Sequence, residues 1–186
     1  MQNRHLNRKL YFCELANTAR EFYLNFLQPH ITLSTDTRVL EIGCGEGGNL
    51  LPFAEMGCNV TGIDICLGRI NEAQTFFAEC HQQGTFICKD FLFTNEPKGE
   101  AERFDLILVH DVIEHIAPCR KKDFLFHITH FLKKRRHRVL WLSCMAKPFR
   151  RSSANQCWLC LQTSLHPSVA PANLPKRVEV KRSHKR

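Results

Sequence analysis

The chain has 186 residues, a formal net charge of +8 and 44% hydrophobic residues. That length suits one domain with a single hydrophobic core. No apolar run approaches the roughly 20 residues that a membrane-spanning helix needs, and the polar start MQNRHLNRKL lacks the apolar stretch of a secretory signal. We therefore expect no membrane association and a cytoplasmic location.

The charge is divided unevenly along the chain. Residues 1–132 contain 12 Lys/Arg and 17 Asp/Glu, whereas residues 133–186 contain 14 and 1. Such a basic tail is typical of nucleic-acid binding. It carries no recognisable binding motif and no interleaved aromatic residues, so we expect no nucleic-acid partner.

The ten cysteines lack the repeated spacing of a disulfide framework or a zinc site, and we expect reduced thiols. Cys157 and Cys160 form one CxxC without a second ligand pair. His127 and His130 are interpreted as residues of a helix surface because no third ligand is evident nearby. We therefore predict no metal.

The first predicted element is a helix over residues 8–28. Its apolar side chains recur at helical spacing, and the predicted buried face consists of Leu10, Leu15, Ala19, Phe22 and Phe26.

Strands and helices then alternate along the chain. The predicted strands cover residues 38–42, 59–63, 85–88 and 104–109, and the predicted helices cover 49–56, 67–82, 111–117 and 120–133. Short loops between them imply right-handed βαβ crossovers and a parallel sheet. The predicted fold class is α/β.

A glycine-rich segment, residues 43–48, follows the first predicted strand. Small residues there allow close approach of backbone to a ligand at the carboxyl edge of the sheet. Asp64 ends the second predicted strand, 21 residues beyond Gly43, where a carboxylate can accept hydrogen bonds from two ribose hydroxyls. Together these features predict a site for a ribose-containing cofactor.

In these motifs the sequence resembles the class I S-adenosylmethionine-dependent methyltransferases, specifically the small-molecule type related to ubiquinone biosynthesis. VLEIGCGEG matches the first family motif, VTGIDI the second, and FDLILVHDVIEHI the motif of the fourth strand. The resemblance covers residues 8–134. It implies a Rossmann-like, doubly wound, mainly parallel sheet in which strands five, six and seven follow the first four. The tail of this chain departs from that pattern: it offers at most a fifth strand at 139–142, and strands six and seven are expected to be missing. The resemblance also implies S-adenosyl-L-methionine as cofactor and a small-molecule methyl acceptor.

The resemblance assigns the methionine side of the cofactor to five positions. Gly43, Cys44 and Gly45 would lie against the methionine part, with Glu41 directly before them. His110, the first residue beyond the fourth strand, would sit near the sulfonium.

The resemblance assigns the nucleoside side to four further positions. Asp64 would hold the ribose and Ile65 would flank the adenine. Asp90, at the end of the third strand, would face the adenine amino group, with Phe91 beside it.

Methyl transfer from a sulfonium is a direct displacement, so the protein supplies alignment and desolvation, and a base only where the acceptor must lose a proton. Asp111 and His115 are the candidates for that base because they lie four residues apart on a predicted helix face. A structural alternative stays open: Asp111 can cap the following helix, and Glu114 and His115 can fix the loop by internal hydrogen bonds.

Two other functions fit part of the pattern. Gly43, Gly45 and Gly48 also satisfy the GxGxxG of an NAD(P)-binding oxidoreductase. Three features favour methyl transfer: Glu41 before the glycines, the helix ahead of the first strand, and the DVIEHI run after the fourth. A non-catalytic S-adenosylmethionine-binding remnant is the third alternative.

The chain is expected to divide into an incomplete methyltransferase domain, residues 1–134, and an atypical basic tail, residues 135–186, that is largely disordered. Back-translating the tail and reading one base later can give GGIVFFGF from residue 135, a Gly-Gly turn followed by an apolar strand. We therefore hypothesise a frameshift, which the gene sequence tests. It predicts an exposed sheet edge, aggregation and impaired turnover.

Overall fold

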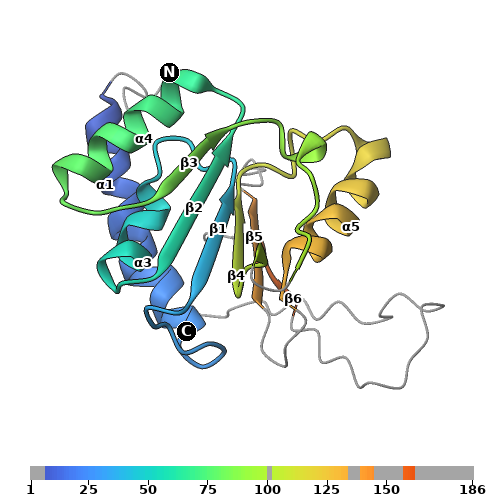
Figure 1. The fold of residues 1–186 in the computed structure, drawn as a ribbon, viewed down its shortest axis with the longest axis horizontal. Helices are drawn as coiled ribbons and strands as arrows, with labels where there is room; N and C mark the ends of the chain where they lie inside the picture. Colours follow the sequence, from blue (N-terminus) through green and yellow to red (C-terminus); the bar gives the residue numbers. More distant parts are fainter. Residues whose placement is uncertain (1–6, 100–101, 134–138, 145–156, 162–186) are drawn as a thin grey trace, which may run out of the picture.

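A computed structural model of the chain describes residues 7–99, 102–133, 139–144 and 157–161. These residues form one mixed sheet with helices on both of its faces. Figure 1 shows α1, α3 and α4 on one side of the sheet and α5 on the other. This arrangement confirms the predicted α/β fold class.

The sheet has six strands in the order β3-β2-β1-β4-β5-β6. Strands β1 to β5 pair in parallel, and β6 pairs antiparallel with β5. Their bounds are β1 Arg38–Ile42, β2 Asn59–Asp64, β3 Thr85–Cys88, β4 Leu106–His110, β5 Val139–Cys144 and β6 Cys157–Leu161. The lateral reversal after β3, which brings β4 to the other side of β1, makes the sheet doubly wound and Rossmann-like, as predicted.

The helical segments connect the strands across both faces. In chain order they are α1 Arg8–Thr18, the π-helix η2 Ala19–Leu24, α2 Asn25–Leu27, the 3₁₀ turn η3 Gly48–Leu50, α3 Leu51–Glu55, α4 Leu67–Glu79, the 3₁₀ turns η4 Phe91–Phe93 and η6 Pro118–Arg120, and α5 Lys121–Phe131. The predicted helix at 49–56 is confirmed almost to the residue, whereas α4 ends three residues earlier than predicted.

Two hydrophobic cores flank the sheet. Val39 and Leu106 pack into the core under α1, α3 and α4, and their chain neighbours Leu40 and Ile107 pack into the core under α5. Successive side chains of a strand point to opposite faces, so a strand covered on both sides must be apolar throughout. β4 meets that requirement from Leu106 to Val109, whereas β1 carries the buried Glu41 among its apolar residues.

The buried face of the first helix differs from the predicted one. Leu10 and Phe22, both predicted to be buried, are each 52% exposed. The sequence carries apolar residues on two neighbouring stripes, and only packing against the sheet selects between them. The π-helical segment adds to the difference because it changes the number of residues per turn. The buried residues are Phe12, Ala16, Ala19, Tyr23 and Leu27.

Two strands lie beyond the fourth. The fifth strand expected at 139–142 is confirmed as β5, which extends to Cys144 and pairs with β4 from Leu106↔Val139 to His110↔Ser143. One further strand, β6, pairs antiparallel with it, which corrects the expectation of no strand beyond the fifth. Both come from the segment predicted to be a tail, so the sheet continues past residue 134. The rest of that segment lies outside the described residues, and the domain boundary and the frameshift stay predictions.

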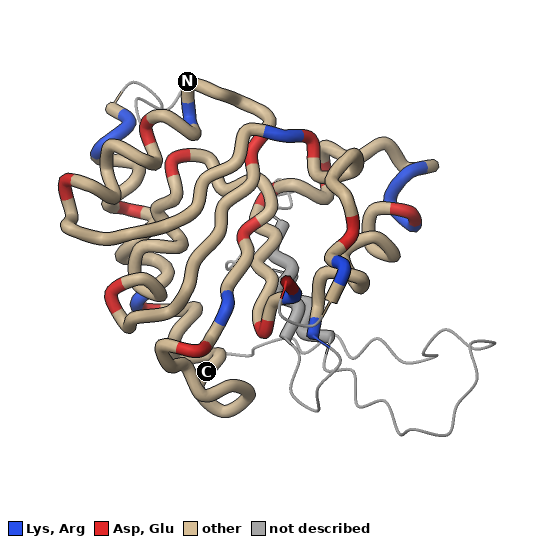
Figure 2. Tube along the Cα trace, viewed as in Figure 1, with Lys and Arg blue, Asp and Glu red and all other residues tan. Residues whose placement is uncertain are grey.

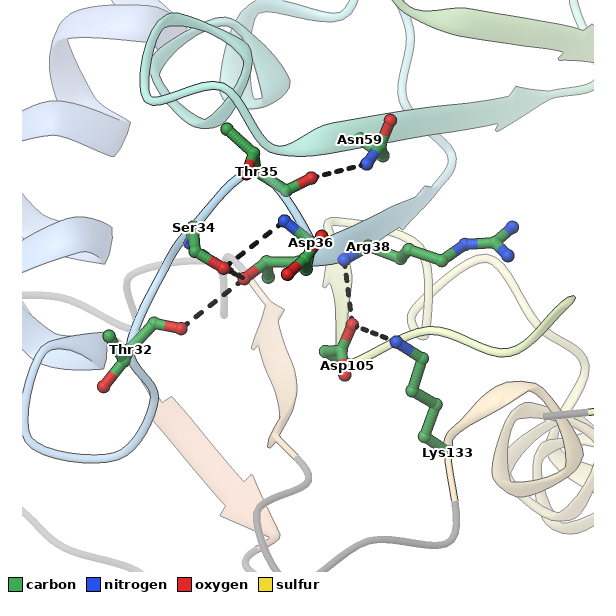
Figure 3. A network of polar contacts seen from close by, with 9 residues as sticks. Thr32, Ser34, Thr35, Asp36, Arg38, Asn59, Asp105 and Lys133 are labelled. Atoms are coloured by element: carbon green, nitrogen blue, oxygen red, sulfur yellow. Dashed lines mark hydrogen bonds and ion pairs between the residues drawn. The ribbon is translucent and has the colours of Figure 1, made fainter. Parts of the chain in front are cut away.

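A polar network closes the edge where the strands begin (Figure 3). Asp105 Oδ2 accepts hydrogen bonds from the Arg38 backbone N at 2.9 Å and from Lys133 Nζ at 2.7 Å. The Lys133 backbone N donates to Phe104 O at 2.8 Å, so the end of α5 is attached to the start of β4. These contacts connect the starts of β1 and β4 to the end of α5 at the amino edge of the sheet.

Charged residues of both signs lie along the described part of the chain. Figure 2 shows Lys and Arg positions interspersed with Asp and Glu along the described part of the trace. In the described ranges no helix is both long and apolar enough to cross a bilayer.

Candidate functional site

The candidate site lies where the winding of the sheet reverses. From β1 the chain continues to β2 and β3 on one side and returns to β4 on the other. In such sheets ligands bind outside the carboxyl ends of the strands at this switch point. The loops that follow β1 and β4 meet there: a Cβ at Gly43 would lie 2.3 Å from Val112 Cγ2.

The loop after β1 is a glycine turn in the left-handed backbone region. Gly43, Gly45 and Gly47 have φ angles of +73°, +51° and +80°, which other residues adopt only at a cost. The Gly43 and Cys44 amides donate to Ile63 O at 2.7 and 3.1 Å, and the Gly47 amide donates to Cys44 O at 2.8 Å. The turn is therefore held by protein acceptors.

Asp64 connects this turn to the end of β2. Its Oδ2 accepts a hydrogen bond from the Gly45 amide at 2.9 Å, and its Oδ1 accepts one from the Cys66 amide at 2.8 Å. Asp64 is 8% exposed, whereas the next side chain, Ile65, is 75% exposed. Each carboxylate oxygen accepts more than one hydrogen bond, so Asp64 keeps acceptor capacity at the edge of the sheet.

Glu41 and Cys44 point into the protein. Glu41 is 1% exposed, and its Oε1 accepts a hydrogen bond from Asn49 Nδ2 at 2.7 Å. Its Oε2 has no hydrogen-bond partner among the described residues. Burial raises the pKa of Glu41 to about 8, against the lowering effects of Asn49 and His110. Contact between Glu41 and a cofactor stays a prediction, because the carboxylate faces Asn49.

The Cys44 side chain packs against the sheet, where a Cβ at Gly62 would lie 2.6 Å from its Sγ. Burial raises the pKa of this thiol. The prediction that Cys44 lies against the methionine part can therefore hold only for its backbone.

Asp90 and Phe91 follow β3 and have different surroundings. Asp90 is exposed and caps η4, with Oδ1 accepting a hydrogen bond from the Leu92 amide at 2.9 Å. Phe91 is only 4% exposed, and its ring contacts those of Phe124 and Phe131. The Phe91 ring belongs to the core beneath α5, so the predicted place of Phe91 beside the adenine can hold only for its backbone and stays a prediction.

His110 ends β4 and both of its ring nitrogens have partners. Nδ1 lies 2.9 Å from Tyr23 Oη, and Nε2 lies 3.2 Å from Asp111 Oδ2. Burial lowers the pKa of His110, but the hydrogen bond and charge of Asp111 outweigh it, so the net shift is upward. Burial also raises the pKa of Tyr23.

Sequence reasoning missed Tyr23, which reaches His110 from 87 positions away. Tyr23 lies in the π-helical segment η2, a type of distortion that is frequent at functional sites. No pattern in the sequence predicted that segment.

The geometry predicted for Asp111 and His115 is wrong. Residues 111–117 form turns instead of a helix, and Asp111 has a φ of +52°. His115 is exposed, and its amide donates to Val112 O at 2.9 Å. The left-handed residue directly after β4 prevents the helix from starting there. Asp111 pairs with His110, and a catalytic role for Asp111 or His115 stays a prediction.

The reason given for expecting no metal also fails. Glu96, from the loop after η4, supplies the third side chain near His127 and His130, with one ligand atom of each within 4.8 Å of the others. The sequence pattern did not show it because Glu96 lies 31 residues before His127.

The doubly wound sheet, the glycine turn at its switch point and the acidic residue ending β2 define a Rossmann-like site for a nucleoside cofactor. A family described as "Methyltransferase domain" matches residues 39–135, more than half of the chain. The chain therefore belongs to this methyltransferase family, as its motifs predicted.

Similar sequences include enzymes named ubiquinone biosynthesis O-methyltransferase. The protein of Nitrobacter winogradskyi is 36% identical over 80 residues, which are 43% of this chain and 29% of that protein. The protein of Sinorhizobium medicae is 39% identical over 82 residues, 43% of this chain and 31% of that protein. The chain thus spans about 30% of the length of these curated relatives.

Solved structures of similar fold include proteins named as methyltransferases. Magnesium protoporphyrin IX methyltransferase from Synechocystis PCC 6803, with bound SAM, has a TM-score of 0.58 and 24% identity, covering 71% of this chain and 59% of that one. A putative sarcosine dimethylglycine methyltransferase from Galdieria sulphuraria has a TM-score of 0.58 and 18% identity, covering 69% and 46%. At these identities the likeness supports the fold.

Proposed function

We propose that the chain binds S-adenosyl-L-methionine at the carboxyl edge of β1, β2 and β4 and transfers its methyl group to a small-molecule acceptor. The observation that carries the proposal is the pairing of the glycine turn with Asp64 at the switch point of the sheet. Family membership supplies the reaction class.

The residues around the turn fit the nucleoside part of this cofactor. Asp64 is held rigidly by two backbone amides and keeps acceptor capacity for ribose hydroxyls. Ile65 presents an apolar side chain to solvent beside it, suited to cover one face of an adenine. Asp90 lies exposed after β3, the neighbour of β2, and offers an acceptor for an amino group.

The same turn argues against the NAD(P) alternative. A pyrophosphate needs backbone amides that point outward at the start of a helix. Here the amides of Gly43, Cys44 and Gly45 are donated to Ile63 O and Asp64 Oδ2. This arrangement disfavours a phosphate and suits a cofactor that contains none.

The chain's contribution to methyl transfer is positioning. The cofactor, when bound, supplies a methyl group already activated by a sulfonium, so alignment and exclusion of water are the tasks left to the protein. His110 is suited to line the reacting centre, because Tyr23 and Asp111 hold both ring nitrogens and fix the ring. For the same reason it is a poor candidate for the base.

The acceptor class follows from similarity alone. The relatives are named O-methyltransferases, so we propose a small molecule whose hydroxyl is methylated. A cytoplasmic location is part of this proposal, supported by the seven cysteines whose side chains the structure describes, all of which are free thiols.

Calorimetry with S-adenosylhomocysteine and with NADH tests the cofactor. We expect binding of the first only. Asp64→Ala should weaken it about 10- to 150-fold, because buried ribose hydroxyls lose a charged acceptor worth about 1.5 to 3 kcal/mol. Asp123→Asn, which alters an exposed carboxylate on α5, is the control and should bind normally. Equal affinity of Asp64→Ala and the control would refute the proposed site.

Turnover requires a separate test because the chain spans only about 30% of its relatives. A screen of hydroxylated acceptors with radiolabelled cofactor, on protein shown to bind S-adenosylhomocysteine, distinguishes the two remaining functions. Methyl transfer to any acceptor supports the enzyme. Binding without transfer to any acceptor supports the non-catalytic remnant.

A further inference from the structure

Three side chains that the cofactor site does not use converge beside α5. His127 and His130 lie one helical turn apart on that helix, and Glu96 reaches them from the loop after η4. Glu96 Oε1 is 3.4 Å from His130 Nδ1 and 4.0 Å from His127 Nδ1. Three atoms that can each donate a lone pair to a cation therefore surround one point.

The contact of His127 with Thr94 determines which ring nitrogen is available. His127 Nε2 lies 3.1 Å from Thr94 O, and a carbonyl oxygen can only accept. Nε2 must therefore carry the hydrogen, and in the neutral ring Nδ1 keeps its lone pair on the side of Glu96. A backbone carbonyl that binds the second nitrogen is the usual support of a metal-binding histidine.

Aromatic packing holds the two rings in place. The His127 ring makes edge contacts with Phe91 and Phe131, at centroid distances of 5.0 and 5.1 Å. The His130 ring makes one with Phe126 at 4.7 Å. The side chains are thus arranged before any ligand arrives, which lowers the entropic cost of binding.

His130 Nδ1 is buried and makes no directed hydrogen bond to any described residue, although Glu96 Oε1 lies 3.4 Å away. A buried polar atom without a hydrogen bond is costly. A cation bound between them would give His130 Nδ1 and Glu96 Oε1 a shared partner.

We propose that Glu96, His127 and His130 form a binding site for a zinc ion, distinct from the cofactor site. Two imidazole nitrogens and one carboxylate oxygen are the donors that Zn²⁺ prefers, at about 2.0 to 2.2 Å. Tetrahedral ligands at that bond length are about 3.4 Å apart. Glu96 and His130 already have that spacing, whereas His127 and Glu96, at 4.0 Å, need to approach each other further. Water completes the fourth position. Mg²⁺ and Ca²⁺, which require mostly oxygen ligands, do not fit.

The site would connect the loop after η4 to α5. Phe91 contacts His127, and Asp90 O accepts a hydrogen bond from Thr94 Oγ1 at 3.2 Å. Zinc would thereby hold the segment that carries Asp90 without contacting the cofactor. The inference does not depend on the proposed function.

Nitrogen-15 NMR of the histidine rings tests the site, because it distinguishes imidazole ligands from the cysteines that also bind zinc. We expect one equivalent of Zn²⁺ to shift the Nδ1 resonances of His127 and His130, and Mg²⁺ to shift neither. His130→Ala and Glu96→Gln should each lower the affinity for Zn²⁺, measured from these shifts, more than about tenfold. Even a partner that only supports a metal ligand is worth 10- to 100-fold in affinity. Glu96 is exposed, so its variant leaves the fold intact.

His81→Asn is the matched control: an exposed histidine after α4, with a φ of +55° that asparagine tolerates. It should leave the zinc-induced shifts unchanged. Unshifted His127 and His130 rings at millimolar Zn²⁺, or equal zinc affinity of wild type and Glu96→Gln, would overturn the proposal. Shifts lost in Glu96→Gln and kept in His81→Asn would support it.

Discussion

The two halves of the carboxyl edge are built in different ways. At β1 and β2 the site is made of backbone: the turn at 43–47 donates its amides to the end of β2, and the whole unit lies within residues 38–66. At β4 it is made of side chains: His110 is held by Asp111 and by Tyr23, which lies 87 positions away. Backbone sites leave a local pattern in the sequence, and side-chain sites assembled from distant segments do not.

Gly43→Ala alters the contact between the loops after β1 and β4. Among these variants it should lower the unfolding free energy most. The new Cβ would lie 2.3 Å from Val112 Cγ2 on a residue with a φ of +73°. A left-handed non-glycine residue costs about 1 to 2 kcal/mol and the steric overlap costs a similar amount, so we expect a loss of about 3 kcal/mol. Urea unfolding measures it.

Gly68→Ala is the matched control, because a Cβ there meets only Cys66 Sγ at 3.9 Å. It lies in the first turn of α4 and should be neutral or slightly stabilising. Equal stability of the two variants would contradict close contact between the loops.

Asp105→Ala tests whether the amino edge of the sheet affects cofactor binding at the carboxyl edge. It removes the acceptor of the Arg38 amide and the partner of Lys133, both within the largely buried network of Figure 3. We expect a loss of about 2 to 3 kcal/mol in unfolding free energy, since an unpaired buried group is costly. Affinity for S-adenosylhomocysteine, measured below the unfolding range, should stay unchanged. A fall in affinity would show that the two edges are coupled.

Glu41→Gln tests the buried acid between the halves. The pKa of Glu41 is about 8 in the folded protein, against an ordinary value of 4.5, because burial disfavours the charged form. The folded state thus keeps a proton that the unfolded chain releases, and wild-type stability should fall as pH rises from 4.5 to 8.

Relative to Glu41→Gln, we expect that fall to amount to no more than about 3 to 4 kcal/mol between pH 5 and pH 8, since one proton contributes at most about 1.4 kcal/mol per pH unit. Chemical unfolding at several pH values measures it. Glu21→Gln, an exposed acid on η2, should keep the wild-type dependence. A Glu41→Gln profile parallel to that of wild type would show that Glu41 is ionised in the fold.

Tyr23→Phe should have the smallest effect. It removes the hydroxyl from His110 Nδ1 and keeps the ring in the core. One hydrogen bond contributes about 1 kcal/mol, which urea unfolding can detect. The same variant should release the His110 ring, visible as altered ring resonances. Unchanged stability together with unchanged resonances would mean that Tyr23 does not hold His110.

Local patterns predicted much of the fold and half of the site. β1 and β3 lie at the predicted residues, and β2 extends by only one. The glycine turn at Gly43 and the carboxylate of Asp64 could be recognised in the sequence. A turn with positive φ needs glycine, and an acidic residue at the end of a strand is a pattern of neighbouring residues. The burial of the Cys44 and Phe91 side chains was not predicted, since spacing shows which residues follow a strand and not which way their side chains point.

The sequence by itself determined the α/β class, the doubly wound sheet implied by its family motifs, and the glycine turn with its acidic partner, because periodicity, glycine placement and strand ends are properties of neighbouring residues. Only the tertiary structure decided which stripe of the first helix is buried, that Tyr23 holds His110, that residues 111–117 are not helical, and that Glu96 lies beside His127 and His130. Those outcomes depend on packing between segments tens of residues apart, and packing energy is shared by many contacts that no local pattern encodes.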